Sequence, residues 1–194
     1  YCWGWNISGA VGDNTSGSPA NNRRTPTAVL GPGGGPALTY TSIALMADHV
    51  CALTGTGAAY CWGRGQDGPI GDNTTFNRLT PTAVLGPGGG PALKFSQISP
   101  GYFRTCAITT AGAAYCWGAW GYLGNGTTSF SYTPAAVHGG KSYSFILGGE
   151  SGSCGIASTG ETYCWGNFAY SNPTDYIPIR PYETPSVSLP LFTK

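Results

Sequence analysis

The chain has 194 residues, and only 9% of them are charged, against about 25% in an ordinary globular protein. Nine lysines and arginines are scattered among eight acidic residues, so the clustered positive charge of a nucleic-acid-binding surface is missing. No stretch of about 18 apolar residues occurs that could cross a membrane as a helix. The 32 glycines and 15 prolines disfavour long helices, whereas the hydrophobic content of 41% can form a core.

A set of landmarks recurs along the chain. The tetrapeptide Tyr-Cys-Trp-Gly starts at Tyr1, Tyr60, Tyr115 and Tyr163. An aromatic residue with an isoleucine three positions later precedes the last three copies by 20 residues, at Tyr40, Phe95 and Tyr143. A Thr-Pro step followed by valine comes after every copy, at Thr25, Thr80, Thr133 and Thr184. We therefore expect one repeat segment, 1–194, with a truncated repeat at 1–4, full repeats at 5–63, 64–118 and 119–166, and the start of another at 167–194.

The fixed part of each repeat has the pattern of β-strands. Ala58, Tyr60 and Trp62 alternate with smaller side chains, which is the period of two of a strand. A glycine stands six residues after the first cysteine of each repeat, where a hairpin turn needs positive φ: Gly57, Gly112 and Gly160. Repeats of roughly 40–60 residues with about four strands each are typical of propeller blades. The sequence therefore predicts an all-β propeller.

The cysteines come in pairs ten residues apart. A hairpin centred on Thr56 places Cys51 opposite Cys61, with their Cβ atoms about 4.5–5.5 Å apart, close to disulfide range. We predict three disulfides, Cys51–Cys61, Cys106–Cys116 and Cys154–Cys164. The alternatives are reduced, buried cysteines, or a zinc site, which lacks nearby ligands beyond His49. Disulfides indicate an oxidising compartment, so we expect a secreted or cell-surface protein.

The first cysteine has no partner in this scheme. Cys2 matches Cys61, so its partner would stand ten residues upstream, before Tyr1. At the other end, Phe192 matches the aromatic landmark at Tyr40. We therefore expect these residues to be a segment of a longer chain. Within this segment we expect Cys2 to be unpaired.

Several motifs together resemble one known family. They are the Gly-x-x-Gly-Asp-Asn-Thr turns at 9–15 and 68–74, the Arg-x-Thr-Pro-x-x-Val pieces from Arg23 and Arg78, and the Cys-Ala-Leu-Thr hairpin. This pattern is similar to the regulator of chromosome condensation (RCC1) repeat, in a secreted, disulfide-containing form. The resemblance implies a seven-bladed β-propeller, of which 194 residues supply about three and a half blades.

The chain departs from the family pattern in several places. The asparagine of the Trp-Gly-x-Asn motif is present only as Asn6, with Gly65, Trp120 and Phe168 at the matching positions. The third turn is shortened at 121–127, and the last is replaced by 167–179. An insertion rich in Gly and Pro runs from Leu30 to Leu38 and recurs from Leu85 to Leu93, and we expect it to be an exposed loop. The family's nucleotide-exchange role at chromatin is not carried over, because a basic surface is missing.

No known catalytic motif is found, so we expect neither an enzyme nor a cofactor. The chain has two histidines, His49 and His138. Cys51, two residues after His49, could be a nucleophile, but the recurring cysteine pairs favour a disulfide at this position. Asp13 and Asp72 recur in matching turns, where hydrogen bonds to the turn backbone are favoured over calcium binding. No metal site is expected.

Other residues are candidates for packing, modification or interaction. One tryptophan per repeat is expected to pack between blades: Trp3, Trp62, Trp117 and Trp165. Four sequons are candidates for N-glycosylation, at Asn6, Asn14, Asn73 and Asn125. Aromatic residues in the connections are candidate interaction anchors: Trp5, Phe76, Trp120, Tyr122, Phe130 and Tyr132.

These features favour an extracellular propeller with a structural or protein-binding role in a larger cell-surface or filamentous glycoprotein assembly. Its partners would be other proteins or further copies of itself, with attached glycans. The alternative is a secreted recognition or inhibitor propeller with one protein target, by analogy with a secreted β-lactamase inhibitor of the same family. An enzyme acting on sugars would need a pair of carboxylates in one cleft, which the eight scattered acidic residues do not indicate.

Overall fold

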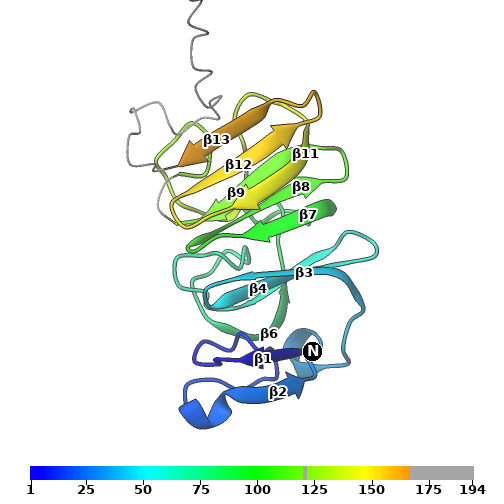
Figure 1. Ribbon diagram of the computed structural model, residues 1–194, viewed down its shortest axis with the longest axis vertical. Coiled ribbons are helices and arrows are strands. Elements are labelled where there is room, and N and C mark those ends of the chain that lie inside the picture. Colours follow the sequence, from blue (N-terminus) through cyan, green and yellow to red (C-terminus); the bar gives the residue numbers. More distant parts are fainter. Residues whose placement is uncertain (120–121, 167–194) are drawn as a thin grey trace, which may run out of the picture.

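The computed structural model describes residues 1–119 and 122–166, and this part of the chain is all-β, as predicted. Four antiparallel sheets follow one another along the long axis of the molecule, with the first sheet near the N-terminus and the fourth at the opposite end (Figure 1). The helices in the described part are short 3-10 turns, and none could cross a membrane: η1 (Pro19–Asn21), η2 (Pro32–Gly34) and η3 (Pro87–Gly89).

The sheets contain strands that are neighbours in the sequence. The first has β1 (Cys2–Gly4) and β2 (Arg23–Thr27). The second has β3 (Tyr40–Met46), β4 (His49–Thr54), β5 (Ala59–Gly63) and β6 (Arg78–Ala83). The third has β7 (Phe95–Pro100), β8 (Arg104–Thr109), β9 (Ala114–Gly118) and β10 (Ser131–Ala136). The fourth has β11 (Tyr143–Gly148), β12 (Gly152–Ala157) and β13 (Thr162–Gly166).

Each complete sheet begins at the aromatic landmark and ends after the Thr-Pro step. The second sheet, for example, runs from Tyr40 to Ala83. Repeats counted from Tyr-Cys-Trp-Gly therefore place three strands of a sheet in one repeat and the fourth strand in the next. The landmarks predicted within 167–194 lie outside the described residues.

The hairpins between the second and third strands have the predicted register. Cys51 pairs with Cys61 across β4 and β5, and the Thr54 amide donates to the Ala58 carbonyl at 3.0 Å. Gly57 closes the turn with φ of 78°. The same geometry recurs in the next two sheets, and the three predicted disulfides are confirmed, each with a Cα–Cα distance of 4.1 Å.

Three of the four repeated tryptophans fill the spaces between sheets, as predicted. Trp62, Trp117 and Trp165 are fully buried. The indole of Trp62 donates a hydrogen bond to the carbonyl of Ala10 at 3.0 Å, and Trp117 donates to Pro69 at 2.9 Å. In each case the carbonyl belongs to the connection of the preceding sheet, so the tryptophan joins two blades.

A glycine of the same connection makes room for the indole. A Cβ atom at Gly12 would lie 2.8 Å from Nε1 of Trp62, and one at Gly71 would lie 2.6 Å from Nε1 of Trp117. Trp3 is different, since 63% of its surface is exposed. The predicted packing of Trp3 between blades is therefore not present in the described residues.

The outer edges of the sheets are partly covered. The amide of Asn14 donates to Leu79 on β6 at 3.1 Å, and that of Asn73 donates to Tyr132 on β10 at 3.0 Å. The Gly-Pro insertions form compact turns, η2 and η3, which contact β6 and β10. Unpaired strand edges promote aggregation, and these turns of one repeat shield the last strand of the next sheet.

Polar groups are buried between the sheets as well. The Thr105 hydroxyl donates to the carbonyl of Pro69 at 2.8 Å, so His49 Nε2, 3.0 Å away, carries the hydrogen it shares with Thr105. At the position of His49 in the next sheet stands Arg104, which donates to the carbonyls of Tyr122 and Glu150 at 3.2 and 3.0 Å. Both side chains tie consecutive sheets together.

Candidate protein-interaction face

The long connections leave the sheets at the same end of the strands. They run from β1 to β2, from β5 to β6 and from β9 to β10, and the short turns between β3 and β4 and between β7 and β8 lie at that end too. This placement follows from antiparallel order, because the first and third strands of each sheet run in the same direction. The candidate interaction face is built from these connections.

An ion pair fixes each of the first two connections. Asp13 accepts from the Thr15 amide at 3.1 Å and the Thr15 hydroxyl at 2.6 Å, while Arg23 donates to its second oxygen at 2.5 Å. Asp72 and Arg78 repeat this arrangement in the next connection. Both carboxylates are thus occupied by turn and arginine hydrogens, which supports the structural interpretation of these residues over calcium binding.

The charge of Asp13 is stabilised in the folded protein. Burial opposes its ionisation, but the hydrogen bonds from Thr15 and Arg23 and the positive charge of Arg23 outweigh burial, so the pKa of Asp13 lies below its usual value. Within the described residues, no group of three or more histidine, cysteine or acidic side chains is placed to hold a metal ion.

The third connection has lost both members of the ion pair. Asn125 stands where Asp13 and Asp72 stand, and Ser131 takes the place of Arg78. The turn itself remains, because the Asn125 side chain accepts from the amide and hydroxyl of Thr127, each at 3.1 Å. A short polar side chain suffices for the turn, and the arginine is present only where the turn carries a carboxylate.

Three predicted interaction aromatics project into solvent from these connections. Trp5, Phe76 and Phe130 are exposed over 60–69% of their surfaces. Tyr122 and Tyr132 are half-buried, and Tyr132 packs its ring against Gly68 of the preceding connection. Trp120 lies outside the described residues.

Phe76 lies on the same connection as Arg64, whose side chain reaches from the second sheet to the third. The backbone of Phe76 lies against Gly65, in the space that a side chain at this position would need. Arg64 places its guanidinium 5.4 Å from the ring centre of Phe103, and Phe103 meets Tyr102 edge-on at 4.3 Å. We call Arg64, Phe76, Tyr102 and Phe103 the Phe76 patch.

Sequence reasoning found one of the four residues of the Phe76 patch. Tyr102 and Phe103 were missed because they follow the aromatic strand landmark rather than Tyr-Cys-Trp-Gly. The signal that could have found them is a Tyr-Phe pair in the turn between β7 and β8, where the second sheet has Ala47 and Asp48.

The candidate glycosylation sites differ in exposure. Asn6 is fully buried, its amide nitrogen donates to the Thr15 carbonyl at 3.0 Å, and its oxygen accepts from the Val11 amide at 2.9 Å. A glycan on Asn6 does not fit this structure, which corrects the expectation for that sequon. Asn14 and Asn73 are exposed in turns with positive φ, and Asn125 is partly exposed.

Cys51 and His49, the residues considered for nucleophilic chemistry, are both engaged in structural contacts. Cys51 is bonded to Cys61, and His49 is buried against Thr105. Burial, together with the positive charge of Arg64, lowers the pKa of His49 to about 4. Cys2 is the free cysteine of the described residues and is partly exposed.

Comparison with known proteins agrees with this architecture. The model of the regulator of chromosome condensation (RCC1) repeat matches residues 56–108, and a second RCC1-repeat model matches residues 40–68. The ultraviolet-B receptor UVR8 of Arabidopsis thaliana is 30% identical over 125 residues, which cover 64% of this chain and 26% of UVR8.

Solved structures show the same fold. Human WBSCR16 is 21% identical with a TM-score of 0.76, over 92% of this chain and 47% of WBSCR16. Prp20p of Saccharomyces cerevisiae is 22% identical with a TM-score of 0.65, over 86% of this chain and 40% of Prp20p. The chain thus spans about a quarter of UVR8 and about half of WBSCR16. With repeat models that match residues 40–108, disulfide-bonded hairpins and a stack of antiparallel sheets, the chain is similar to the RCC1-repeat proteins and has the fold of their β-propellers.

Proposed function

We propose that this chain is an extracellular, protein-binding part of a β-propeller that contributes to a larger cell-surface or filamentous glycoprotein assembly. The proposal assigns binding rather than catalysis. Three disulfides, each joining two neighbouring strands of one sheet, favour an oxidising compartment, because such bonds persist outside the reducing cytosol.

The Phe76 patch is the observation that carries the proposal. Exposed aromatic residues and arginine are the side chains that most often anchor protein–protein contacts. Phe76 is 69% exposed on a connection that the Asp72–Arg78 ion pair holds in place. An aromatic side chain on a fixed support loses little conformational freedom when a partner covers it, and this favours binding.

Protein binding has also been studied for related propellers. Yeast RCC1 (Prp20) has been crystallised bound to Kap60, and Prp20p has been examined for binding to Gsp1p and histones. These partners belong to those proteins, which share the fold with this chain at 18–22% identity. For this chain we propose only the same kind of activity, which is recognition of a protein surface, and none of those partners.

The test compares capture by wild type with capture by a patch variant. The 194-residue chain is immobilised and exposed to extracellular proteins from the source organism, and the bound proteins are identified by mass spectrometry. We expect the Phe76→Ser variant to capture at least tenfold less of the specific partner than wild type does. Phe145→Ser is the matched control, since Phe145 is an exposed aromatic residue of β11 that lies outside the patch. Equal loss in both variants, or loss in neither, would reject the patch as the binding site.

A second candidate function is a secreted recognition or inhibitor propeller with one soluble protein target. It is favoured by the cluster of Arg64, Tyr102 and Phe103, which lies at one junction, between the second and third sheets. Light scattering of the captured complex separates the two candidates. A complex of fixed, low stoichiometry supports the second, and growth into large, open-ended assemblies supports the first.

The compartment is tested separately. Cells that produce the protein at its natural level are treated with acid and a thiol-blocking maleimide, and the labelled protein is weighed intact. We expect the six cysteines of the three hairpins to stay unlabelled, as three intact disulfides. Labelling of these six cysteines would place the protein in a reducing compartment and overturn the extracellular proposal.

A further inference from the structure

The turn of the third connection combines an asparagine with a glycine. Asn125 holds the position that Asp13 and Asp72 hold in the first two connections, and Gly126 follows it where those connections have an asparagine. Asn125-Gly126 is the one Asn-Gly step in the sequence. Because glycine has no side chain, its backbone nitrogen can approach the side chain of the residue before it more closely than other residues allow.

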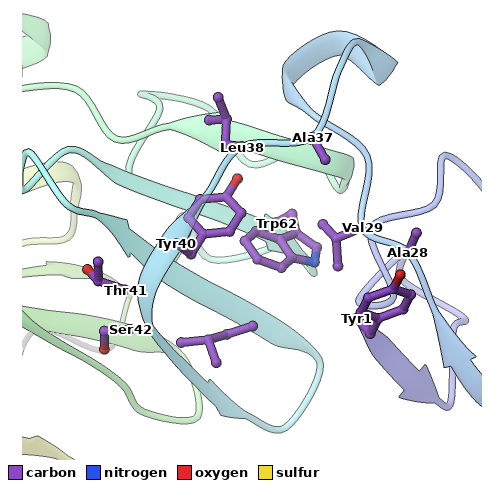
Figure 2. Close-up of a pocket in the computed structure, with 10 residues that line it drawn as sticks. Tyr1, Ala28, Val29, Ala37, Leu38, Tyr40, Thr41, Ser42 and Trp62 are labelled. Carbon is purple, nitrogen blue, oxygen red and sulfur yellow. The ribbon is translucent and has the colours of Figure 1, made fainter.

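The fold holds the backbone in front of Asn125 in place. A Cβ atom at Gly124 would lie 2.6 Å from Cδ1 of Trp165, so this glycine packs tightly on the indole of the fourth sheet. Gly12 packs on Trp62 in the same way, and Figure 2 shows that indole at the junction of the first and second sheets. Asn125 therefore starts its turn from a fixed support.

The side chain of Asn125 is arranged so that a nucleophile can attack it. Asn125 is half-buried, whereas Gly126 and Thr127 are exposed to water. The oxygen Oδ1 of Asn125 accepts from the amide and from the hydroxyl of Thr127, each at 3.1 Å. When Cγ is attacked, negative charge develops on Oδ1, and two fixed donors at this oxygen stabilise that charge.

We propose that Asn125 is a self-modification site, at which the backbone nitrogen of Gly126 converts the side-chain amide to a carboxylate with water as the co-reactant. The Gly126 nitrogen gives up its proton and forms a bond to Cγ of Asn125. The bond from Cγ to Nδ2 breaks, and Nδ2 leaves as ammonia with that proton. The product of this step is a succinimide ring.

One water molecule then opens the succinimide ring. Attack of water on Cγ breaks the bond from Cγ to the Gly126 nitrogen and gives aspartate. Attack on the main-chain carbonyl carbon breaks the main-chain bond instead and gives isoaspartate, in which the chain continues through Cγ. Asparagine and one water thus give one acidic residue and one ammonia, and no oxidant or reductant is required.

Other asparagines of the connections are less suited to this reaction. Asn14 and Asn73 are exposed in the matching turns, but a threonine follows each of them. The branched Cβ atom of threonine crowds the backbone nitrogen that would have to attack. Asn14 and Asn73 therefore serve as internal comparisons within the same chain.

The step from Asp67 to Gly68 is the nearest chemical competitor. Ring closure at an aspartate requires its neutral acid form, because a carboxylate is a poor electrophile. The Asp67 carboxylate forms an ion pair with Arg64 at 3.5 Å. The observations therefore favour Asn125 over Asp67 as the site of reaction.

The modification changes the charge of the candidate interaction face. An aspartate in place of Asn125 keeps the acceptor that the turn needs, since Asp13 and Asp72 accept from their turn amides at 3.1 Å. Ser131 stands where the arginine of the second connection stands, so the turn offers the new carboxylate no arginine. The formal charge of the chain, nine cations less eight anions, falls from +1 to 0 with a ninth anion.

The test follows the folded 194-residue chain over time. The chain is produced without N-glycans, because Asn125 begins a sequon and a glycan would occupy Nδ2. It is kept in mildly alkaline buffer at body temperature, digested in mild acid and mapped by mass spectrometry, and isoaspartate is detected with an isoaspartyl methyltransferase. We expect conversion at Asn125 at least tenfold faster than at Asn14 or Asn73, with aspartate and isoaspartate both formed.

Gly126→Asn is the matched variant. Asparagine fits this position, because Asn14 and Asn73 have φ of 63° and 62° in the matching turns and Gly126 has φ of 81°. We expect the variant to unfold at nearly the same temperature as wild type and to convert Asn125 at least tenfold more slowly.

Four results would overturn the proposal. They are equal rates at the three compared asparagines, a wild-type rate in the Gly126→Asn variant, conversion only after unfolding in urea, and aspartate formed without isoaspartate. The last result would indicate direct hydrolysis of the amide by water. The reaction needs no binding partner, so this proposal and that of the Phe76 patch can fail separately.

Discussion

Arg78 donates a hydrogen bond from Nε to Oδ2 of Asp72 at 2.6 Å, and its terminal Nη2 nitrogen forms an ion pair with the same oxygen at 2.5 Å. Only 5% of the Asp72 side chain is exposed, against 35% of the Arg78 side chain. A hydrogen bond between two charged groups is roughly twice as strong as one between neutral groups. The Asp72 charge would be expensive to leave alone at this depth, so the pair holds the connection on which Phe76 lies.

A double-mutant cycle should measure this coupling. We expect Arg78→Ser to lower the free energy of unfolding by about 1–2 kcal/mol, because it leaves a nearly buried carboxylate with one partner fewer. Adding Asp72→Asn should recover part of this loss, since the third connection has Asn125 and Ser131 at these positions. Urea unfolding of wild type, both single variants and the double variant gives the coupling energy. Strictly additive effects would show that the ion pair does not stabilise the turn.

Close packing of Gly71 against Trp117 leads to a second prediction. Gly71→Ala should destabilise the protein by about 2–4 kcal/mol, because it adds a methyl group 2.6 Å from the indole nitrogen at φ of 81°. Gly17→Ala is the matched control, with φ of 85° and open space around the new methyl group. We expect the control to cost only about 1 kcal/mol, from backbone strain. Similar midpoints of thermal unfolding for the two variants would contradict the packing argument.

Local features of this fold could be predicted from the sequence because they depend on short-range spacing. Ten residues with a glycine at the sixth position define a hairpin whose register brings Cys51 onto Cys61. The burial of Trp62, Trp117 and Trp165 follows from their recurrence once per repeat on one side of a strand. The exposure of Trp3 could not be predicted in this way, because burial depends on the neighbouring sheet and not on the residue's own repeat.

The candidate site was harder to predict for the same reason. Phe76 was found as an aromatic residue in a connection, but its contact region depends on Arg64 reaching Phe103 of another sheet. Asn6 begins a sequon, whereas its side-chain amide forms hydrogen bonds that shape the connection from β1 to β2. Sequence position identifies a connection, and only the three-dimensional packing of two repeats decides which side chains remain accessible.

Removing one disulfide should have a moderate effect. Replacing Cys106 and Cys116 together with alanine should lower the free energy of unfolding by about 2–3 kcal/mol, the chain-entropy cost for a loop of about ten residues. Both sulfurs are fully buried, and the change also removes the contact of Cys106 Sγ with the buried Ser153 hydroxyl at 3.4 Å. Urea unfolding in the absence of reductant measures the change. A stability equal to that of wild type would mean that the sheet constrains this hairpin without the bond.

Exposure of the sequons predicts which ones a eukaryotic secretory host can modify. We expect glycans at Asn14 and Asn73, whose side chains are exposed in turns, and none at Asn6, which is buried. The glycans are released enzymatically in water labelled with heavy oxygen, which marks each asparagine that carried a glycan. Peptide mapping by mass spectrometry then gives the occupancy at each asparagine. Occupancy of Asn6 in folded, secreted protein would contradict the structure described above.

The burial of His49 predicts a loss of stability in mild acid. Burial and the positive charge of Arg64 lower the pKa of His49 from 6.5 to about 4, because the folded protein disfavours the imidazolium form. The unfolded chain takes up the proton near its ordinary pKa, so stability is fully present above pH 6.5 and falls as the pH drops towards 4. The slope should approach about 1.4 kcal/mol per pH unit, for a total of about 3 kcal/mol.

His49→Gln provides the matched variant for this measurement. Glutamine keeps an N–H group that can donate to Thr105 but has no proton to gain, so its free energy of unfolding should stay nearly flat between pH 7 and pH 4.5. Asp13 does not affect the measurement in this range. Its pKa is lowered in the folded protein, so the stability that its charge provides is lost only as the pH falls below the ordinary carboxyl pKa of 3.8. Urea unfolding across the range decides the question. If the variant and the wild type lose stability with the same slope, a group other than His49 controls the acid sensitivity.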